Sequence, residues 1–257
     1  MLFQIKSYLN FLWRSTNQHG IHSPFVYNLV TKCFYDKKDY PEYKILDQYR
    51  KSLLNNKSEI SVTDFGVGSK VFKSNVRSIG AIARNAGITE KRAHLLLRIA
   101  CYLDAKDILE VGTSVGLATA ALSLANKNSV ITSLEGCPAT AAVAASALNK
   151  ISHNVKVVET EFSLFLSSEA VHKKFDLIYF DGNHSKAATL KYVEMLLPTV
   201  RNETVWIFDD IHWSDEMQQA WCEIQAHPLV RVTIDTYQWG IVFFRREQEK
   251  ENFAVRV

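Results

Sequence analysis

Short apolar and β-branched runs alternate with helical patterns from residue 107 to residue 245. The runs predict strands at 107–111, 130–134, 155–159, 175–180, 203–208, 229–235 and 240–245. The segments between them are rich in Ala, Leu and charged residues, and they predict helices at 116–126, 138–150, 184–197 and 214–226. This alternation is typical of a mostly parallel sheet with helices on both faces. A tight connection at Gln238-Trp239 predicts that the last strand runs antiparallel to the one before it.

The N-terminal part lacks this alternation. Its patterns predict helices near 2–15, 23–35, 42–55, 75–86 and 89–103. Ser23 and Pro24 are expected to cap the second of these helices, and Asp64 to Ser69 is expected to form a loop that closes over a ligand or simply links two helices. We therefore predict a helical N-terminal substrate region (1–100), an α/β core (101–246) and a C-terminal tail (247–257).

Composition is that of an ordinary globular protein, but charge is unevenly divided. The 257 residues are 47% hydrophobic and 22% charged. Residues 1–100 hold 16 Lys and Arg against 7 Asp and Glu, a net charge of +9, whereas the remaining residues have a net charge of −6. Because the basic residues are scattered, a solvated surface is the favoured interpretation, and an anionic partner is the alternative. Four separated cysteines without a Cys-x-x-Cys pair favour reduced thiols and a cytoplasmic protein.

The first thirteen residues are apolar and aromatic, but Lys6 and Asn10 interrupt them and no cleavage site follows. We expect a packed helix and no transmembrane segment. A peripheral membrane contact through Phe3, Tyr8, Phe11 and Trp13 is the alternative.

The junction of the first core strand with its helix is the strongest functional signal. The sequence Glu110-Val-Gly112-Thr-Ser-Val-Gly116 follows an apolar strand, and its glycines allow a tight turn and a close helix start that suit an anionic ligand. A dinucleotide-binding fold would have three glycines as Gly-x-Gly-x-x-Gly, which disfavours an NAD-dependent oxidoreductase. The next strand ends in Glu135, where such folds place an acid on ribose hydroxyls.

These features together resemble the class I S-adenosylmethionine-dependent methyltransferases, and among them the small-molecule O-methyltransferases related to catechol O-methyltransferase. The resemblance covers roughly residues 90–246 and implies a Rossmann-like fold. It implies that Glu110, Gly112, Thr113, Ser114 and Gly116 hold the methionine end of the cofactor. It further implies that Glu135 binds the ribose and that Glu161 and Phe162 contact the adenine.

Acidic residues follow the next two strands. Asp181-Gly-Asn-His184 ends one strand and Asp209-Asp210-Ile-His212 ends the other, and both ends are expected at the ligand-binding edge of the sheet. Crowded carboxylates repel one another unless a cation or shared protons relieve them, and a divalent metal ion is the favoured interpretation. In metal-using relatives these places bind magnesium, so the resemblance implies a Mg²⁺ site at Asp181, Asp209 and Asp210, with Asp181 also near the cofactor. Those relatives have Asn where this chain has Asp210.

Methyl transfer needs alignment and a deprotonated nucleophile. Candidates for the proton transfer are His212, His184 and Asp181, or magnesium acting directly on the acceptor hydroxyl. The structural alternatives are that Asp181, Asp209 or Asp210 caps the following helix and that either histidine is merely packed. His19 and His22 are further candidates on the substrate side, and Trp213 and Trp239 are candidates for the wall of an acceptor pocket.

We therefore expect a methyltransferase that acts on a hydroxyl of a small molecule, with S-adenosylmethionine and optionally Mg²⁺ as cofactors. The expected partner is a small-molecule substrate, and a homodimer is compatible with the sequence. The alternatives are a nucleic-acid methyltransferase, which the lack of an Asn-Pro-Pro-Tyr signature and of an RNA-binding motif disfavours, an NAD-dependent oxidoreductase, and a non-catalytic cofactor-binding module.

Overall fold

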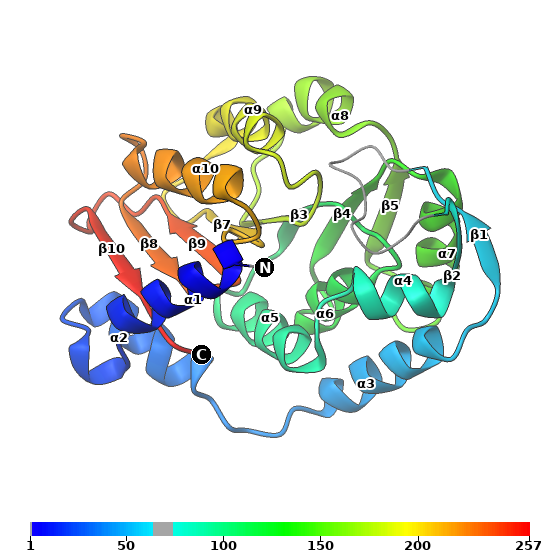
Figure 1. Ribbon diagram of the computed structural model, residues 1–257, viewed down its shortest axis with the longest axis horizontal. Coiled ribbons are helices and arrows are strands. Elements are labelled where there is room, and N and C mark those ends of the chain that lie inside the picture. The colour runs from blue at the N-terminus through cyan, green and yellow to red at the C-terminus, as the bar shows by residue number, and fades with distance from the viewer. Residues whose placement is uncertain (1, 64–73) are drawn as a thin grey trace. The chain divides into compact units, whose positions relative to one another are not determined.

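The computed structural model describes residues 2–63 and 74–257 and divides into two units (Figure 1). Unit 1 comprises residues 1–36 and 166–257, and unit 2 comprises residues 37–165. The loop predicted at Asp64 to Ser69 lies outside the described residues.

Unit 2 contains three parallel strands and their connecting helices, preceded by three helices and a small two-stranded sheet. Its elements are α3 (Pro41–Leu54), β1 (Glu59–Ser61), β2 (Val76–Ser78), α4 (Ile79–Asn85), α5 (Glu90–Tyr102), β3 (Asp107–Val111), α6 (Leu117–Ala125), β4 (Val130–Glu135), α7 (Pro138–Leu148), β5 (Val155–Glu159) and the first half of α8 (Phe162–Ser168).

The strands of unit 2 lie in the order β3-β4-β5. The parallel register pairs Glu110 with Ser133 and Glu135 with Glu159. In β3 every residue after Asp107 is buried, as expected for a strand of a parallel sheet that is covered on both faces. The register brings the end of β3 beside the end of β4, which places the predicted glycine turn next to Glu135.

Unit 1 contains five strands, their helices, and the N-terminal helices. Its elements are α1 (Leu2–Arg14), α2 (Pro24–Leu29) with a π-helical extension (Val30–Phe34), β6 (Leu177–Phe180), α9 (Lys186–Leu196), β7 (Val205–Asp209), α10 (Asp215–Ala226), β8 (Val232–Asp235), β9 (Trp239–Phe243) and β10 (Glu251–Ala254).

The strands of unit 1 lie in the order β10-β8-β9-β7-β6. β6 and β7 are parallel, and their register pairs Phe180 with Phe208, so Asp181 and Asp209 follow at the same edge. β9 is antiparallel to both β7 and β8. β6 and β7 are buried along their whole length, and the rings of Phe180 and Phe208 stack in this core with centroids 4.3 Å apart.

The structure confirms the predicted α/β class with a mostly parallel larger sheet and an antiparallel hairpin strand. Apart from the small β1/β2 pair, the described residues contain eight strands where seven were predicted. The additional strand is β10, which pairs parallel to β8 and appears in red in Figure 1. Its sequence gives no strand pattern because only Phe253 of its four residues is buried. The small β1/β2 pair was also not predicted, since each of its strands has only three residues.

The connection of the final hairpin differs from the prediction. Trp239 is not part of the turn but the first residue of β9, where it is 1% exposed and packs edge-to-face on Tyr179. The turn consists of residues 236–238, with Tyr237 in the left-handed region at φ 73°. The predicted capping of α2 is confirmed, because Ser23 accepts a hydrogen bond from the Val26 amide and Pro24 is the first helical residue.

Candidate active site

The turn after β3, residues 112–116, has the backbone shape that its glycines allow. Gly112, Ser114 and Gly116 all have positive φ, at 106°, 50° and 82°. The amides of Gly112 and Thr113 both donate to the carbonyl of Leu134, at 3.0 Å. This turn, which we call the cofactor turn, is therefore fixed against the last residues of β4.

Gly116 is required by space as well as by conformation. A Cβ atom at this position would lie 2.8 Å from the hydroxyl oxygen of Tyr49. That hydroxyl donates to the carbonyl of Val115 at 3.0 Å, so α3 contacts the cofactor turn directly. Tyr49 was not among the predicted site residues, because no motif marks a tyrosine sixty residues before the turn. α6 begins immediately afterwards at Leu117, and the amides of its first turn favour an anionic ligand group.

Glu135 is bound to the cofactor turn from the end of β4. Its carboxylate accepts hydrogen bonds from the amide of Ser114, at 2.7 Å, and from the amide of Cys137, at 2.9 Å. These two backbone donors fix the carboxylate beside the turn.

Glu110 is completely buried and forms the centre of a hydroxyl network. Its Oε2 atom accepts hydrogen bonds from Thr119, at 2.6 Å, and from Ser133, whose hydroxyl also contacts that of Thr113 at 2.5 Å. Burial raises the pKa of Glu110 to about 8, although the Ser133 and Thr119 hydroxyls favour the ionised form. Its second oxygen, Oε1, has no hydrogen-bond partner among the described residues. Ser133 and Thr119 were not predicted, but Ser133 could have been found from its register opposite Glu110.

The two residues predicted to contact adenine lie at the start of α8. Glu161 precedes this helix, and its carboxylate accepts hydrogen bonds from the amides of Ser163 and Leu164, both at 3.0 Å. Phe162 is the first helical residue and is partly exposed. The structure thus gives Glu161 a helix-capping interaction, which the sequence analysis did not foresee.

In unit 1, the ends of β6 and β7 bring together Asp181, His184, Asp209 and Asp210, which we call the acidic cluster. The Nε2 atom of His184 lies 3.6 Å from Oδ1 of Asp181. The side chains of Asp181 and His184 are 16% and 24% exposed, whereas Asp209 is buried. Asp210 is also partly exposed, so Asp209 is the one member of the acidic cluster that is closed to a small molecule.

Asp181 and His184 both have raised pKa values, which favour their protonated forms. Burial, and then the neighbouring Asp209 carboxylate, raise the pKa of Asp181 well above its usual value. Burial opposes the charged form of His184, but the hydrogen bond and charge of Asp181 outweigh it and raise the pKa of His184 to about 9. The Asp181–His184 pair therefore holds at least one proton at neutral pH.

The backbone around the cluster explains why the acids are not helix caps. The N-cap of α9 is Ser185, which accepts from the Ala188 amide, and the N-cap of α10 is Ser214, which accepts from the Met217 amide. Asp210 is in the left-handed region at φ 54°, a conformation that Asp tolerates better than most residues. The capping alternative considered for Asp181, Asp209 and Asp210 is therefore wrong.

His212 lies apart from this chemistry in a buried chain of hydrogen bonds. Its Nδ1 atom is 3.0 Å from the Ser7 hydroxyl, and its Nε2 atom is 2.9 Å from Oδ2 of Asp235. The imidazole is 3% exposed and its ring stacks on Tyr237, with centroids 5.2 Å apart. Both ring nitrogens are occupied by protein groups, and this arrangement fastens α1 to the end of β8. Ser7 could not be predicted, since it is 205 residues away from His212.

The fit of a metal ion can be tested on the donor atoms themselves. Among the described residues, one group of three side chains brings its donor atoms within 4.8 Å of one another, and that group is Asp47, Glu90 and His94. Asp181, Asp209 and Asp210 do not form such a group. As placed, their side chains do not supply the closely spaced oxygens that Mg²⁺ requires, and the magnesium site remains a prediction.

The remaining candidates lie at the surface or in the core. His19 and His22 are exposed. The ring Nε2 of His19 lies 3.2 Å from the side-chain amide nitrogen of Gln18, and its backbone amide donates to Asn17. Trp239 is a core residue, as described above, and Trp213 is partly buried. No helix among the described residues combines the length and the apolar character needed to cross a membrane.

Comparisons with known proteins agree with this geometry. A family model described as a methyltransferase domain matches residues 109–211, which run from β3 to just beyond β7. The match includes Glu110, the cofactor turn, Glu135 and the whole acidic cluster, so the motifs found in the sequence lie inside the matched segment. A search of curated proteins finds no match.

Solved structures show the same fold over most of the chain. The S-adenosylhomocysteine-bound methyltransferase PaMTH1 of Podospora anserina is 14% identical, with a TM-score of 0.62, covering 88% of this chain and 97% of that one. The O-methyltransferase TomG of Streptomyces achromogenes, in complex with S-adenosylmethionine, is 16% identical, with a TM-score of 0.56 and coverage of 84% and 95%. An O-methyltransferase from Bacillus cereus, in complex with S-adenosylhomocysteine, is 16% identical, with a TM-score of 0.54 and coverage of 83% and 95%. The predicted methyltransferase fold is confirmed.

Proposed function

We propose that this protein transfers the methyl group of S-adenosylmethionine to a hydroxyl oxygen of a small molecule. The observation that carries the proposal is the pair of carboxylates at the ends of β3 and β4. Glu135 is held on two backbone amides beside the cofactor turn, and Glu110 keeps one buried oxygen without a partner among the described residues. Solved proteins of the same fold bind this cofactor or its product.

The residues present fit this cofactor. A buried carboxylate oxygen without a hydrogen bond is costly, and a cationic ligand group such as an ammonium would relieve that cost. Glu135 offers acceptors for the two ribose hydroxyls, and the amides that begin α6 favour the ligand's carboxylate. Glu161 and Phe162 remain the candidates for the adenine. When bound, the cofactor supplies an activated methyl group, and the protein has to align an acceptor and remove its proton.

The proton of the acceptor hydroxyl is assigned to the acidic cluster. Asp181 is the better base of its pair, because His184 with a pKa of about 9 already carries a proton at neutral pH. The raised pKa of Asp181 makes its carboxylate a stronger base than an ordinary aspartate. His184, in contact with Asp181, favours the ionised form of that carboxylate and orients it. His212 is assigned a structural role, because both of its nitrogens are hydrogen-bonded inside the protein.

The decisive experiment is incubation of the purified protein with methyl-labelled S-adenosylmethionine and a metabolite extract, followed by fractionation of labelled products. We expect label in a small molecule with wild-type protein and at least about a hundredfold less with Asp181→Asn, because general-base catalysis contributes at least this much. A parallel incubation with a chelator tests the predicted magnesium. Label in no fraction, despite cofactor binding, would favour a non-catalytic cofactor-binding module.

Calorimetric titration separates the cofactor classes. We expect S-adenosylmethionine to bind to the wild-type protein, and we expect Glu135→Gln to weaken this binding. We expect no binding of NAD. Binding of NAD without binding of S-adenosylmethionine would refute the proposal. Label that appears in RNA or DNA when nucleic acid is added would favour the nucleic-acid alternative, which the basic N-terminal part motivates.

A further inference from the structure

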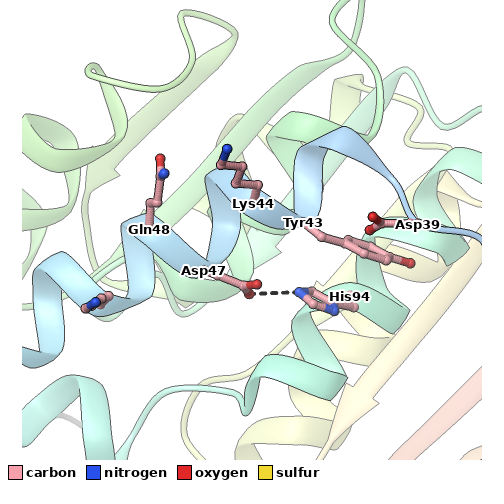
Figure 2. Close-up of a pocket in the computed structure, with 7 residues that line it drawn as sticks. Asp39, Tyr43, Lys44, Asp47, Gln48 and His94 are labelled. Atoms are coloured by element: carbon pink, nitrogen blue, oxygen red, sulfur yellow. Dashed lines mark hydrogen bonds and ion pairs between the residues drawn. The ribbon is translucent and has the colours of Figure 1, made fainter.

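Unit 2 has a second polar site, on helices α3 and α5, that the proposed methyl transfer does not use. Its pocket has a volume of about 330 Å³ and is lined by residues that include Tyr43, Lys44, Asp47, Lys51 and His94. Figure 2 shows the Asp47 side chain of α3 directed at the imidazole of His94 on α5. This pair was not among the sequence predictions, because the two residues are 47 positions apart and belong to no motif.

Three metal-ligating side chains converge here. Asp47 lies in the middle of α3, Glu90 is the first residue of α5, and His94 follows one helical turn later on the same face. One donor atom from each lies within 4.8 Å of the other two. Two opposite ligands of an ion with bonds of about 2.1 Å are about 4.2 Å apart, so small side-chain adjustments bring all three donors onto one ion.

The Asp47–His94 distance is already that of two adjacent ligands. Oδ1 of Asp47 and Nε2 of His94 are 2.9 Å apart. Adjacent donors on an ion with bonds of about 2.1 Å lie about 3.0 Å apart in octahedral geometry and about 3.4 Å apart in tetrahedral geometry. A metal ion can therefore replace the proton that this pair shares, with a displacement of no more than about half an ångström.

The imidazole of His94 is held in place by an aromatic ring stacked on its face. The ring of Tyr43 stacks on His94 with centroids 3.9 Å apart and an angle of 7°. The hydroxyl of Tyr43 in turn accepts a hydrogen bond from Nη1 of Arg98 at 2.8 Å. These contacts restrict the ring plane and keep Nε2 directed at Asp47.

We propose that Asp47, Glu90 and His94 bind a divalent transition-metal ion of the Zn²⁺ class. One imidazole and two carboxylates suit Zn²⁺ better than Mg²⁺ or Ca²⁺, which prefer oxygen donors throughout. Two carboxylates also neutralise the charge of the ion. Three protein donors leave at least one coordination position for water or for an added ligand, as in metal sites that are not purely structural.

Occupation of this site joins two helices that both support the cofactor turn. α3 carries Tyr49, which lies two residues after Asp47 and donates to the carbonyl of Val115 in the cofactor turn. α5 leads into β3, the strand that precedes this turn. A metal ion that binds only the folded state adds stability in proportion to its concentration over its Kd. Zinc is therefore expected to raise the unfolding temperature of the protein.

The test is calorimetric titration of the full-length protein with ZnCl₂, in the absence of S-adenosylmethionine. Variants His94→Ala and Glu90→Gln remove one ligand each. Glu90 is exposed, so its replacement does not endanger folding. Matched controls are His153→Ala and Glu42→Gln, which alter an exposed histidine of unit 2 and an acid of α3 outside the group. Asp181→Asn is included because the acidic cluster could also attract the ion.

We expect one ion per chain, a Kd at least about tenfold weaker in His94→Ala and Glu90→Gln, and unchanged binding in the three other variants. The zinc-induced rise of the unfolding temperature should be lost in the same two variants. Binding that is insensitive to His94 and Glu90, binding that depends on Asp181 alone, or no binding to the wild-type protein would each overturn the proposal. None of these results depends on methyl transfer.

Discussion

The buried carboxyl of Glu110 makes a measurable prediction about the pH dependence of stability. Its pKa is raised from 4.5 to about 8 in the folded protein by burial, and the unfolded chain restores the ordinary value. Between these two values the folded protein carries a proton that the unfolded chain has lost. Stability therefore falls as pH rises, with a slope of about 1.4 kcal/mol per pH unit from this one group.

The magnitude follows from the two pKa values. Between pH 5.5 and pH 7.5 the slope accumulates to about 2.5 kcal/mol, slightly less than two full units because both ends of the interval overlap the titrations. The loss is complete once pH exceeds the folded pKa of about 8. Since the side chain is 0% exposed, solvent screening does not reduce this figure appreciably.

The perturbation that isolates the effect is Glu110→Gln, which keeps the shape of the side chain and removes its titration. Urea unfolding of both proteins is measured from pH 5 to pH 8.5, and the difference in the free energy of unfolding is plotted against pH. We expect the variant to gain about 2.5 kcal/mol relative to wild type between pH 5.5 and 7.5, whatever constant offset the amide introduces. The control is Glu59→Gln, an exposed acid of β1, for which the difference should be flat. A flat difference for Glu110→Gln would refute the idea that this carboxyl is protonated in the folded protein.

Four further predictions concern the same elements. Glu135→Gln should weaken S-adenosylmethionine binding at least about tenfold in calorimetry, a loss of about 1.4 kcal/mol, while the circular dichroism spectrum stays unchanged. Gly116→Ala should destabilise the protein by about 1–2 kcal/mol in urea unfolding, because alanine is strained at φ 82° and its methyl group meets Tyr49; a neutral result would contradict the assigned turn geometry. His212→Ala should destabilise it by about 2 kcal/mol, since Asp235 loses the His212 hydrogen bond but keeps the Tyr237 amide and Arg14 as partners, and a catalytic defect without loss of stability would restore His212 as a base. Wild-type affinity for S-adenosylmethionine, which is cationic, should increase from pH 6 to pH 8.5 in calorimetry as Glu110 ionises, and this increase should be absent in Glu110→Gln.

The sequence predicted those parts of the fold that depend on local pattern. β3 and β5 were located at their observed bounds, because each is a short apolar or β-branched run followed by a turn signal. The cofactor turn was predictable for a similar reason, since only glycine adopts φ 106° and 82° without strain. β10 could not be predicted, because an edge strand with one buried side chain has no apolar alternation to reveal it.

The sequence predicted which site residues lie at the ends of strands, but not which side chains they contact. Asp181 and Asp209 share an edge because β6 and β7 are parallel and in register, which the sequence implies. The hydrogen-bond partner of each side chain could not be predicted, because these partners come from distant segments of the chain. Ser7 and Asp235 hold His212 from opposite ends of the chain, and Asp47 meets His94 across two helices. No local pattern encodes these contacts.

The two histidines that follow β6 and β7 show why this distinction decides the chemistry. By spacing, His184 and His212 are equivalent, each three residues after an aspartate that ends a strand. His184 is 24% exposed and contacts one carboxylate of the acidic cluster, whereas His212 is 3% exposed and has both nitrogens bound to the protein. A residue that transfers protons to a ligand needs a free lone pair and a path to the ligand. Of the two histidines, only His184, with its partner Asp181, is accessible to a ligand. His212 differs from it because Ser7 in α1 and Asp235 bind both of its ring nitrogens.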